Sequence, residues 1–176
     1  MKPTIIVIIL FICNSEIFSQ SNKICWDENR KLTWDDFTVI RGESAPKFSA
    51  LSFCGIKANL KLNLVVSYLI KDKSWVILSK KSKLNLLEHE KLHFDIVELF
   101  ARKMRREFGI SNEDDIEKIY DCNMLILDEF QDRYDSETNH GIIDSEQNCW
   151  IEYVKDELKK LDNYKTTINH CEILKD

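Results

Sequence analysis

The sequence has 176 residues, of which 44% are hydrophobic and 31% are charged, and its net charge at neutral pH is −5. This length and apolar content suit one globular domain with a buried core and argue against a disordered chain. The mildly acidic balance, without a basic stripe, argues against nucleic acid as a partner.

Residues 1–19 have the pattern of a secretory signal peptide. Lys2 supplies a positive charge ahead of an apolar run over 5–13, which is too short to span a bilayer, and polar residues follow up to a cleavage point near Ser19. An uncleaved N-terminal anchor is the alternative. We therefore predict a mature domain over 20–176 that is secreted or periplasmic, with no stable membrane insertion once the signal is removed.

Five cysteines remain in the predicted mature domain: Cys25, Cys54, Cys122, Cys149 and Cys171. Export permits disulfides, and five thiols allow two bridges with one thiol left over. Cys25 and Cys54 are the pair that we expect in the N-terminal part, while the pairing among the other three stays open. Because no two cysteines are spaced as C-x-x-C, nothing indicates a cysteine metal site or a redox motif.

The part of the chain before residue 80 predicts a small β-sheet. Apolar residues alternate with polar residues over 56–64, which is the period of a half-buried strand. Two further apolar and β-branched runs, over 65–70 and 75–78, are separated by the polar residues 71–74, which are typical of a hairpin turn.

Three helices are predicted to follow the strands. The first spans about 82–108 and ends at Gly109, since glycine is typical of a helix C-terminus. The second begins in the acidic stretch 111–115 and ends near Thr138, and the third covers about 144–161. The expected fold class is therefore α+β, with a small β-sheet followed by three helices.

The first predicted helix contains an H-E-x-x-H motif, with His89, Glu90 and His93 as its defining residues. Residues four apart lie on one helix face, roughly 6 Å apart along the axis, so the two imidazoles can bind one Zn²⁺. Glu90 would then lie beside the open position of the metal, where it can take a proton from bound water. Two core histidines with ordinary hydrogen-bond partners are the structural alternative.

The helical phase of this segment favours the metal interpretation. Seven charged residues lie within about 50° of one direction on the helical wheel and predict a solvated face. They are Glu88, Lys91, Asp95, Glu98, Arg102, Arg105 and Arg106. His89 and His93 fall on roughly the opposite side, with Ile96 and Phe100, where an unpaired imidazole would be costly.

A catalytic zinc site usually has three protein ligands and an open water position, so a third ligand is needed. The metzincin extension is excluded, because Ile96 and Leu99 stand where that class has glycine and histidine. His140 is favoured over His170, since antiparallel packing of the first two helices would bring His140 back towards His89. An exposed histidine in a helix-capping turn is the alternative for His140. Four acidic residues also remain candidates: Asp135, Glu137, Asp144 and Glu146.

Three motifs, in this order, resemble the bacterial domain-of-unknown-function 922 family. They are LTWDDF over 32–37, LLEHEKLHFD over 86–95 and YDSETNHG over 134–141. Members of that family are predicted to be secreted zinc-dependent proteases of the H-E-x-x-H superfamily, and the resemblance covers most of the predicted mature domain. It implies a zincin-like metallopeptidase domain over 20–176, with zinc on His89, His93 and His140 and with Glu90 catalytic.

Tyr134, six residues before His140, is a second candidate catalytic residue. Its phenol could hydrogen-bond the oxyanion of a tetrahedral intermediate, or it could simply pack in the core with a satisfied hydroxyl. We expect a zinc-dependent peptidase that acts on protein or peptide substrates outside the cytoplasm. The alternative is an exported, non-catalytic module that binds zinc or a peptide.

Overall fold

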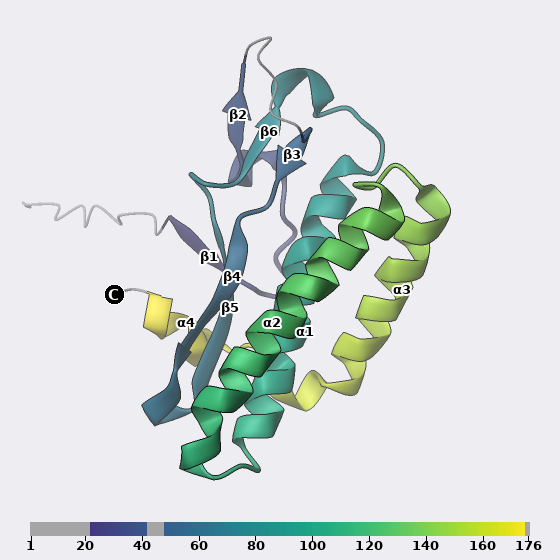
Figure 1. Ribbon diagram of the computed structural model, residues 1–176. Helices are drawn as coiled ribbons and strands as arrows, with labels where there is room; N and C mark the ends of the chain where they lie inside the picture. The colour runs from purple at the N-terminus through teal and green to yellow at the C-terminus, as the bar shows by residue number, and fades with distance from the viewer. Residues whose placement is uncertain (1–21, 42–47, 175–176) are drawn as a thin grey trace, which may run out of the picture.

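The computed structural model describes residues 22–41 and 48–174 (Figure 1). The predicted signal peptide over 1–19 lies outside these described residues. Within them, no helix combines the length and the apolar character that crossing a membrane requires.

Three long helices form one side of the molecule. They are α1 (Leu86–Phe108), α2 (Glu113–Thr138) and α3 (Asp144–Lys160). The predicted ends at Gly109 and Thr138 are confirmed. The first helix begins later than predicted, because the preceding Asn85 is left-handed, with φ of 62°, and cannot continue a helix.

The strands form two three-stranded sheets. The first has the order β1-β5-β4 and is antiparallel, with β1 at Lys23–Cys25, β5 at Leu64–Ile70 and β4 at Cys54–Asn59. The second has the order β2-β6-β3, with β2 at Thr38–Ile40, β6 at Trp75–Ile77 and β3 at Ala50–Leu51. In it β2 is parallel and β3 antiparallel to β6. The predicted α+β class is confirmed.

The hairpin predicted around 71–74 is wrong, because β5 and β6 belong to different sheets. Ser74, at the end of this turn, is fully buried and is held by both neighbouring segments: its hydroxyl donates to the Ile70 carbonyl and accepts from the Phe53 amide. The chain therefore leaves β5 without folding back on it. The alternating run over 56–64 is also not one strand, since Leu60–Leu62 forms a 3₁₀ turn after β4.

The main core lies between the first sheet and the helices (Figure 1). Helix α1 packs against β4 and β5, and both α2 and α3 pack on α1. Val65 of the sheet, Phe100 of α1, Leu127 of α2 and Val154 of α3 all belong to this core. Because α1 has neighbours on several sides, charged residues along it are also buried.

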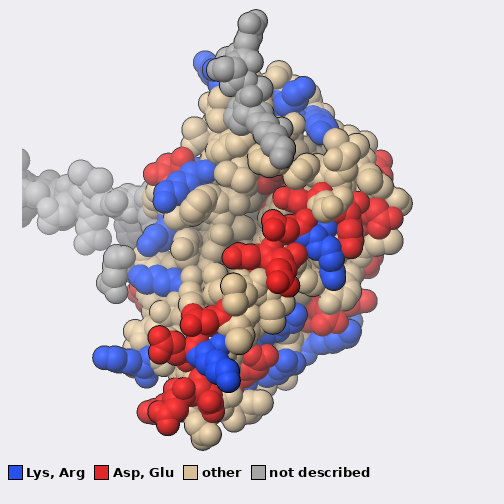
Figure 2. Space-filling view, in the orientation of Figure 1, with Lys and Arg blue, Asp and Glu red and all other residues tan. Residues whose placement is uncertain are grey.

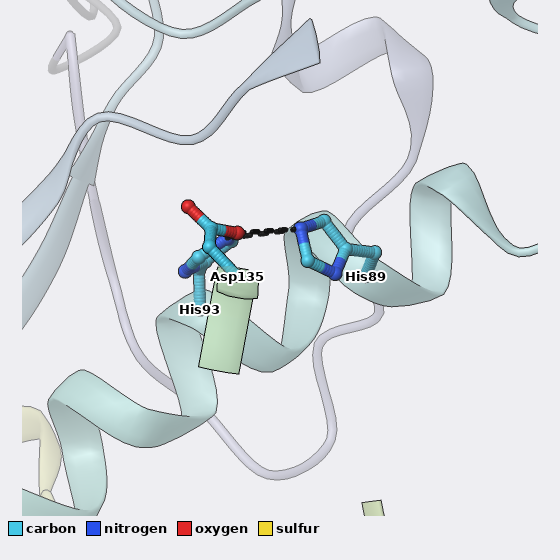
Figure 3. Close-up of side chains that lie close together, drawn as sticks. All are labelled: His89, His93 and Asp135. Carbon is cyan, nitrogen blue, oxygen red and sulfur yellow. Dashed lines mark hydrogen bonds and ion pairs between the residues drawn. The ribbon is translucent and has the colours of Figure 1, made fainter. Parts of the chain in front are cut away.

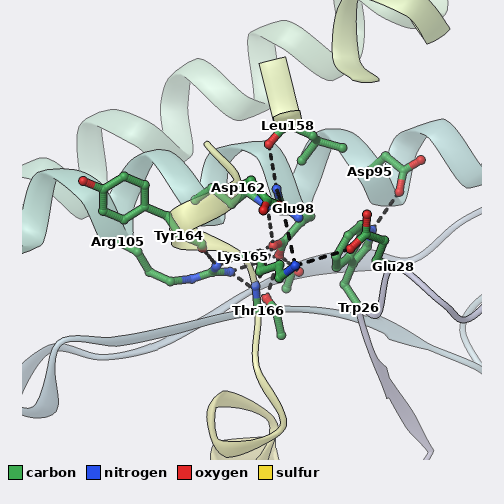
Figure 4. Close-up of polar contacts among 12 residues, drawn as sticks. Trp26, Glu28, Asp95, Glu98, Arg105, Leu158, Asp162, Tyr164, Lys165 and Thr166 are labelled. Atoms are coloured by element: carbon green, nitrogen blue, oxygen red, sulfur yellow. Dashed lines mark hydrogen bonds and ion pairs between the residues drawn. The ribbon is translucent and has the colours of Figure 1, made fainter. Parts of the chain in front are cut away.

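The predicted solvated face of α1 is wrong in its C-terminal half. Glu98 is 0% exposed, and Arg102 and Arg105 are also buried. The segment after α3 folds back over this face, where Thr166 donates its amide to Glu98 and Arg105 donates to the Tyr164 carbonyl (Figure 4). We call Glu98, Arg102, Arg105 and Thr166, together with Ser67 of β5, the Glu98 cluster.

One disulfide, between Cys25 and Cys171, joins β1 to the short helix α4 (Ile168–Cys171). The expected pair Cys25–Cys54 is wrong, because β1 and β4 lie on opposite sides of β5. Residues two strand spacings apart are roughly 9–10 Å from each other, which exceeds the Cα separation of about 7 Å that a disulfide can bridge. Cys54, Cys122 and Cys149 are free thiols, so the described residues contain one bridge where two were expected.

Candidate metal centre

His89 and His93 lie one turn apart near the start of α1, as the motif predicts. Their rings are edge-to-face with centroids 4.7 Å apart, and their Nε2 atoms are 3.2 Å apart. His89 is buried, and both histidines line a cavity of about 310 Å³. The predicted inward direction of the two imidazoles is therefore confirmed.

Asp135 of α2 completes a group of three donors with the two histidines (Figure 3). Its Oδ1 atom lies 3.0 Å from the Nε2 of His89 and 3.0 Å from the Nε2 of His93. Ligands held at about 2.0–2.1 Å in a tetrahedral zinc site are roughly 3.3 Å from one another. The three donors form a triangle close to that size, so His89, His93 and Asp135 could hold a metal ion.

Two glutamine side chains contact the Nδ1 atoms of the motif histidines. The Nδ1 of His89 lies 3.2 Å from Gln147 Oε1, and the Nδ1 of His93 lies 2.5 Å from Gln131 Oε1. An amide oxygen only accepts hydrogen bonds, so these contacts are hydrogen bonds in the tautomer whose Nδ1 carries the hydrogen. The neutral imidazoles then direct Nε2 lone pairs at each other and at a carboxylate. Such a convergence of acceptors requires a cation, either a metal ion or protons on the rings.

The charge state of the site agrees with this requirement. Burial alone would lower the pKa of His93, but the hydrogen bond to Asp135 and the negative charges of Glu90 and Asp135 raise it above its ordinary value. Burial would raise the pKa of Asp135, but the hydrogen bonds with His89 and His93 hold it far below its ordinary range. Asp135 is therefore an anion, which is the form that binds metals.

Acidic side chains lie on the exposed surface of α2. Figure 2 shows them gathered over α2, the helix that carries Asp135, and its exposed members include Asp128, Glu129 and Asp132. These exposed carboxylates make the electrostatic potential over α2 more negative.

Glu90 lines the same cavity without belonging to the donor group. It is 4% exposed, and its Oε2 atom has no hydrogen-bond partner among the described residues. An unpaired buried polar atom costs about 1–3 kcal/mol, and more when it is charged. This oxygen therefore marks a place in the cavity where a polar partner such as water fits.

His140 lies at the rim of the cavity, beside the donor group. Its Nδ1 atom is 3.3 Å from Asp135 Oδ1, its side chain is 43% exposed, and its ring centroid is 6.4 Å from that of His89. The structure thus brings the predicted ligand near the site, but the donor that it groups with both histidines is Asp135, one of the acidic alternatives. Zinc ligation by His140 stays a prediction.

The backbone that carries His140 is strained. Asn139, His140 and Gly141 are all left-handed, with φ of 47°, 53° and 74°. This conformation costs roughly 1–2 kcal/mol for a residue with a Cβ atom, and such strain is concentrated at functional sites. At Gly141 a Cβ atom would lie 2.8 Å from the Cβ of His89, so only glycine lets this turn pack directly on the first histidine.

Tyr134 lies behind His89 and is fully buried. Its ring stacks on the imidazole with centroids 4.6 Å apart, and its hydroxyl donates to Gln147 Oε1 at 2.8 Å. Tyr134 is not among the residues that line the cavity. These contacts favour a role in positioning His89, and the oxyanion role of Tyr134 stays a prediction.

The other candidates have partners elsewhere. Glu137 accepts a hydrogen bond from Trp150, Asp144 accepts one from Asn85, and His170 accepts one from the Thr167 amide. Glu146 lines a separate surface pocket. None of the four belongs to the donor group found among the described residues.

Sequence reasoning missed Gln131 and Gln147. Gln131 lies one helical turn before Asp135, and Gln147 lies three residues before the buried Trp150. This helical spacing could have indicated that the two side chains point inward. It could not have indicated that each of them contacts a particular imidazole.

No protein-family model, curated protein or solved structure matches the chain. A function for this chain is therefore inferred from the donor geometry, from Glu90 and from the three sequence motifs.

Substitutions of Asp135 and His140 distinguish the two candidate third ligands. Asp135→Asn should lower zinc affinity by at least about 100-fold, because an amide is a poor zinc ligand. His140→Gly should lower zinc affinity by less than about tenfold. Glycine adopts the left-handed conformation without strain, so this substitution should not disturb the turn, and any loss of affinity reports the missing imidazole. Zinc affinity is measured by competition with a chelator, with the exposed Asp132→Asn as the control. The opposite ranking would assign the third position to His140.

Proposed function

We propose that this protein is a zinc-dependent peptidase of the H-E-x-x-H type that acts outside the cytoplasm. The observation that carries the proposal is the buried, unpartnered Oε2 of Glu90 in the cavity that His89, His93 and Asp135 also line. A purely structural metal site has no use for such a carboxylate. A hydrolytic site needs one beside the metal as a general base.

The residues fit zinc, since two imidazoles and one carboxylate are a donor set that catalytic zinc sites use, and His89, His93 and Asp135 would hold the ion. Zinc, when bound, supplies Lewis acidity that brings the pKa of a bound water to about 7 and polarises the scissile carbonyl. Glu90 then accepts a proton from the attacking water and delivers it to the leaving amine. The cavity of about 310 Å³ is at the small end of ligand sites, which suits a short stretch of peptide.

Secretion and substrate class belong to the same proposal. The signal-peptide pattern and the Cys25–Cys171 disulfide both support an oxidising compartment outside the cytoplasm. The resemblance to the domain-of-unknown-function 922 family supports a zincin-like fold and a protein or peptide substrate.

A non-catalytic, exported zinc-binding or peptide-binding module is the second candidate. It is favoured by His140, whose Nδ1 lies 3.3 Å from Asp135 Oδ1 and offers a fourth donor. A site closed by four protein ligands is typical of structural zinc and has no position for water.

Glu90→Gln tests the two candidates against each other. Glutamine keeps the size of the side chain but removes its basicity, so zinc content should be unchanged. Cleavage of a peptide library should fall by at least about 100-fold. Zinc content and cleavage are measured on the zinc-loaded wild type and variant, with the exposed neighbour Glu88→Gln as the control. Wild type and Glu90→Gln that bind zinc but cleave equally poorly would favour the non-catalytic module.

A further inference from the structure

We infer that Gln131 and Gln147 are positioning residues that fix the tautomer and the rotation of the two motif histidines, so that both Nε2 atoms face the metal position. The inference rests on the proposed function in taking zinc as the metal. It assigns a role in the site to α3, which contributes none of the metal donors.

Gln147 reaches His89 from the first turn of α3. It is 1% exposed, and its Oε1 atom accepts hydrogen bonds from two groups, Tyr134 Oη at 2.8 Å and His89 Nδ1 at 3.2 Å. Its amide nitrogen has no hydrogen-bond partner among the described residues. Both of these contacts of the Gln147 amide are therefore made by its oxygen.

Gln131 holds His93 from α2 at two points. Its Oε1 lies 2.5 Å from His93 Nδ1, and its Nε2 donates to the backbone carbonyl of the same residue at 3.0 Å. The second bond fixes which end of the amide faces the ring. His93 is therefore held with its Nε2 towards Asp135 Oδ1.

Both acceptors are neutral amides, whereas a metal-bound histidine often donates its second N–H to a carboxylate. A carboxylate at either position would add negative charge next to the imidazole. With two amides, Asp135 supplies the negative charge of the donor group. More of the positive charge of zinc then remains available to water and to a substrate carbonyl.

Gln147→Met and Gln147→Glu test the inference. Methionine keeps the volume and removes the acceptor, so zinc affinity should fall by about 10–100-fold. The hydrogen bond from His89 Nδ1–H, read from the downfield NMR shift of that proton in metal-free protein with both imidazoles protonated, should also be lost. Glutamate keeps the acceptor oxygen and should restore this hydrogen bond and bring zinc affinity to within roughly threefold of wild type. Asn148→Met, an exposed change on the same helix, is the control and should alter neither.

The outcomes separate this inference from the proposed function. If wild type binds zinc, and Gln147→Met changes neither zinc affinity nor the His89 Nδ1–H hydrogen bond, the positioning role is overturned and the peptidase proposal stands. If wild type binds no zinc, but Gln147→Met still removes the His89 Nδ1–H hydrogen bond, the positioning role is supported and the zinc proposal is overturned. If Gln147→Met does not fold, the less buried Gln131→Met gives the same readout at His93, and an unchanged His93 Nδ1–H hydrogen bond there overturns the inference.

Discussion

Replacing Glu98 by glutamine is expected to lower the free energy of unfolding by about 3–5 kcal/mol. Its carboxylate accepts hydrogen bonds from Arg102 Nε at 3.0 Å, Arg105 Nη2 at 3.0 Å and Ser67 Oγ at 2.6 Å. Glutamine keeps the size of the side chain but removes its charge. Two buried guanidinium groups would then lack their main counter-charge, which is the costly way to break a buried ion pair.

Chemical denaturation measures this effect, and the same helix offers a matched control. Glu88 is also paired, with Lys91 at 2.7 Å, but its side chain is 57% exposed. Glu88→Gln should change the free energy of unfolding by no more than about 0.5 kcal/mol. Equal and small effects at Glu88 and Glu98 would contradict the structural role of the Glu98 cluster.

The stabilisation by Glu98 should also depend on pH. Burial alone would raise the pKa of Glu98, but the charge of Arg105 and the hydrogen bonds from Ser67, Arg105 and Arg102 lower it below its ordinary value of 4.5. The contribution is then complete above pH 4.5 and is lost as the pH falls from there towards the folded-state pKa. The difference in unfolding free energy between wild type and Glu98→Gln should shrink below pH 4.5, and a constant difference would contradict the assignment.

Removing the Cys25–Cys171 disulfide is expected to lower the free energy of unfolding by about 5 kcal/mol. The bonded residues are 146 positions apart, and a crosslink that closes so long a loop removes much of the conformational entropy of the unfolded chain. The double variant Cys25→Ala, Cys171→Ala is compared with wild type by denaturation without reductant. Cys122→Ala, at an exposed free thiol, is the control and should change little.

Thiol counting gives an independent check of the disulfide. In the unreduced, denatured wild type, the described residues should contribute three reactive thiols, from Cys54, Cys122 and Cys149. A denaturation midpoint that reductant does not shift, together with five reactive thiols, would show that the bond does not form.

The helices could be predicted because their signals are local. Apolar spacing and terminal residues placed the ends of α1 and α2 at Gly109 and Thr138. Strand pairing is non-local, and nothing within 65–78 indicates that β6 pairs with β2 and β3 instead of with β5. A helical wheel likewise gives the direction of Glu98 but not the Thr166 segment that covers it.

In the candidate site, too, the local features could be predicted from the sequence and the non-local contacts could not. His89, Glu90 and His93 lie within about one helical turn, so their spacing alone places them together. The third donor depends on how α1 and α2 pack, and the sequence therefore left Asp135 among several acidic candidates. Gln131 and Gln147 carry no charge and form no motif, so their hydrogen bonds to the histidines became visible only in the folded structure.

The strand order β1-β5-β4 also affects which cysteines can meet as the chain folds. Cys54, Cys122 and Cys149 all lie between the two bonded cysteines in the sequence, so each of them is nearer to Cys25 along the chain than its native partner is. Once β1 and β4 have paired with β5, the central strand keeps Cys25 and Cys54 apart. The first sheet thus protects the Cys25 thiol from the wrong partner that is nearest to it in the sequence.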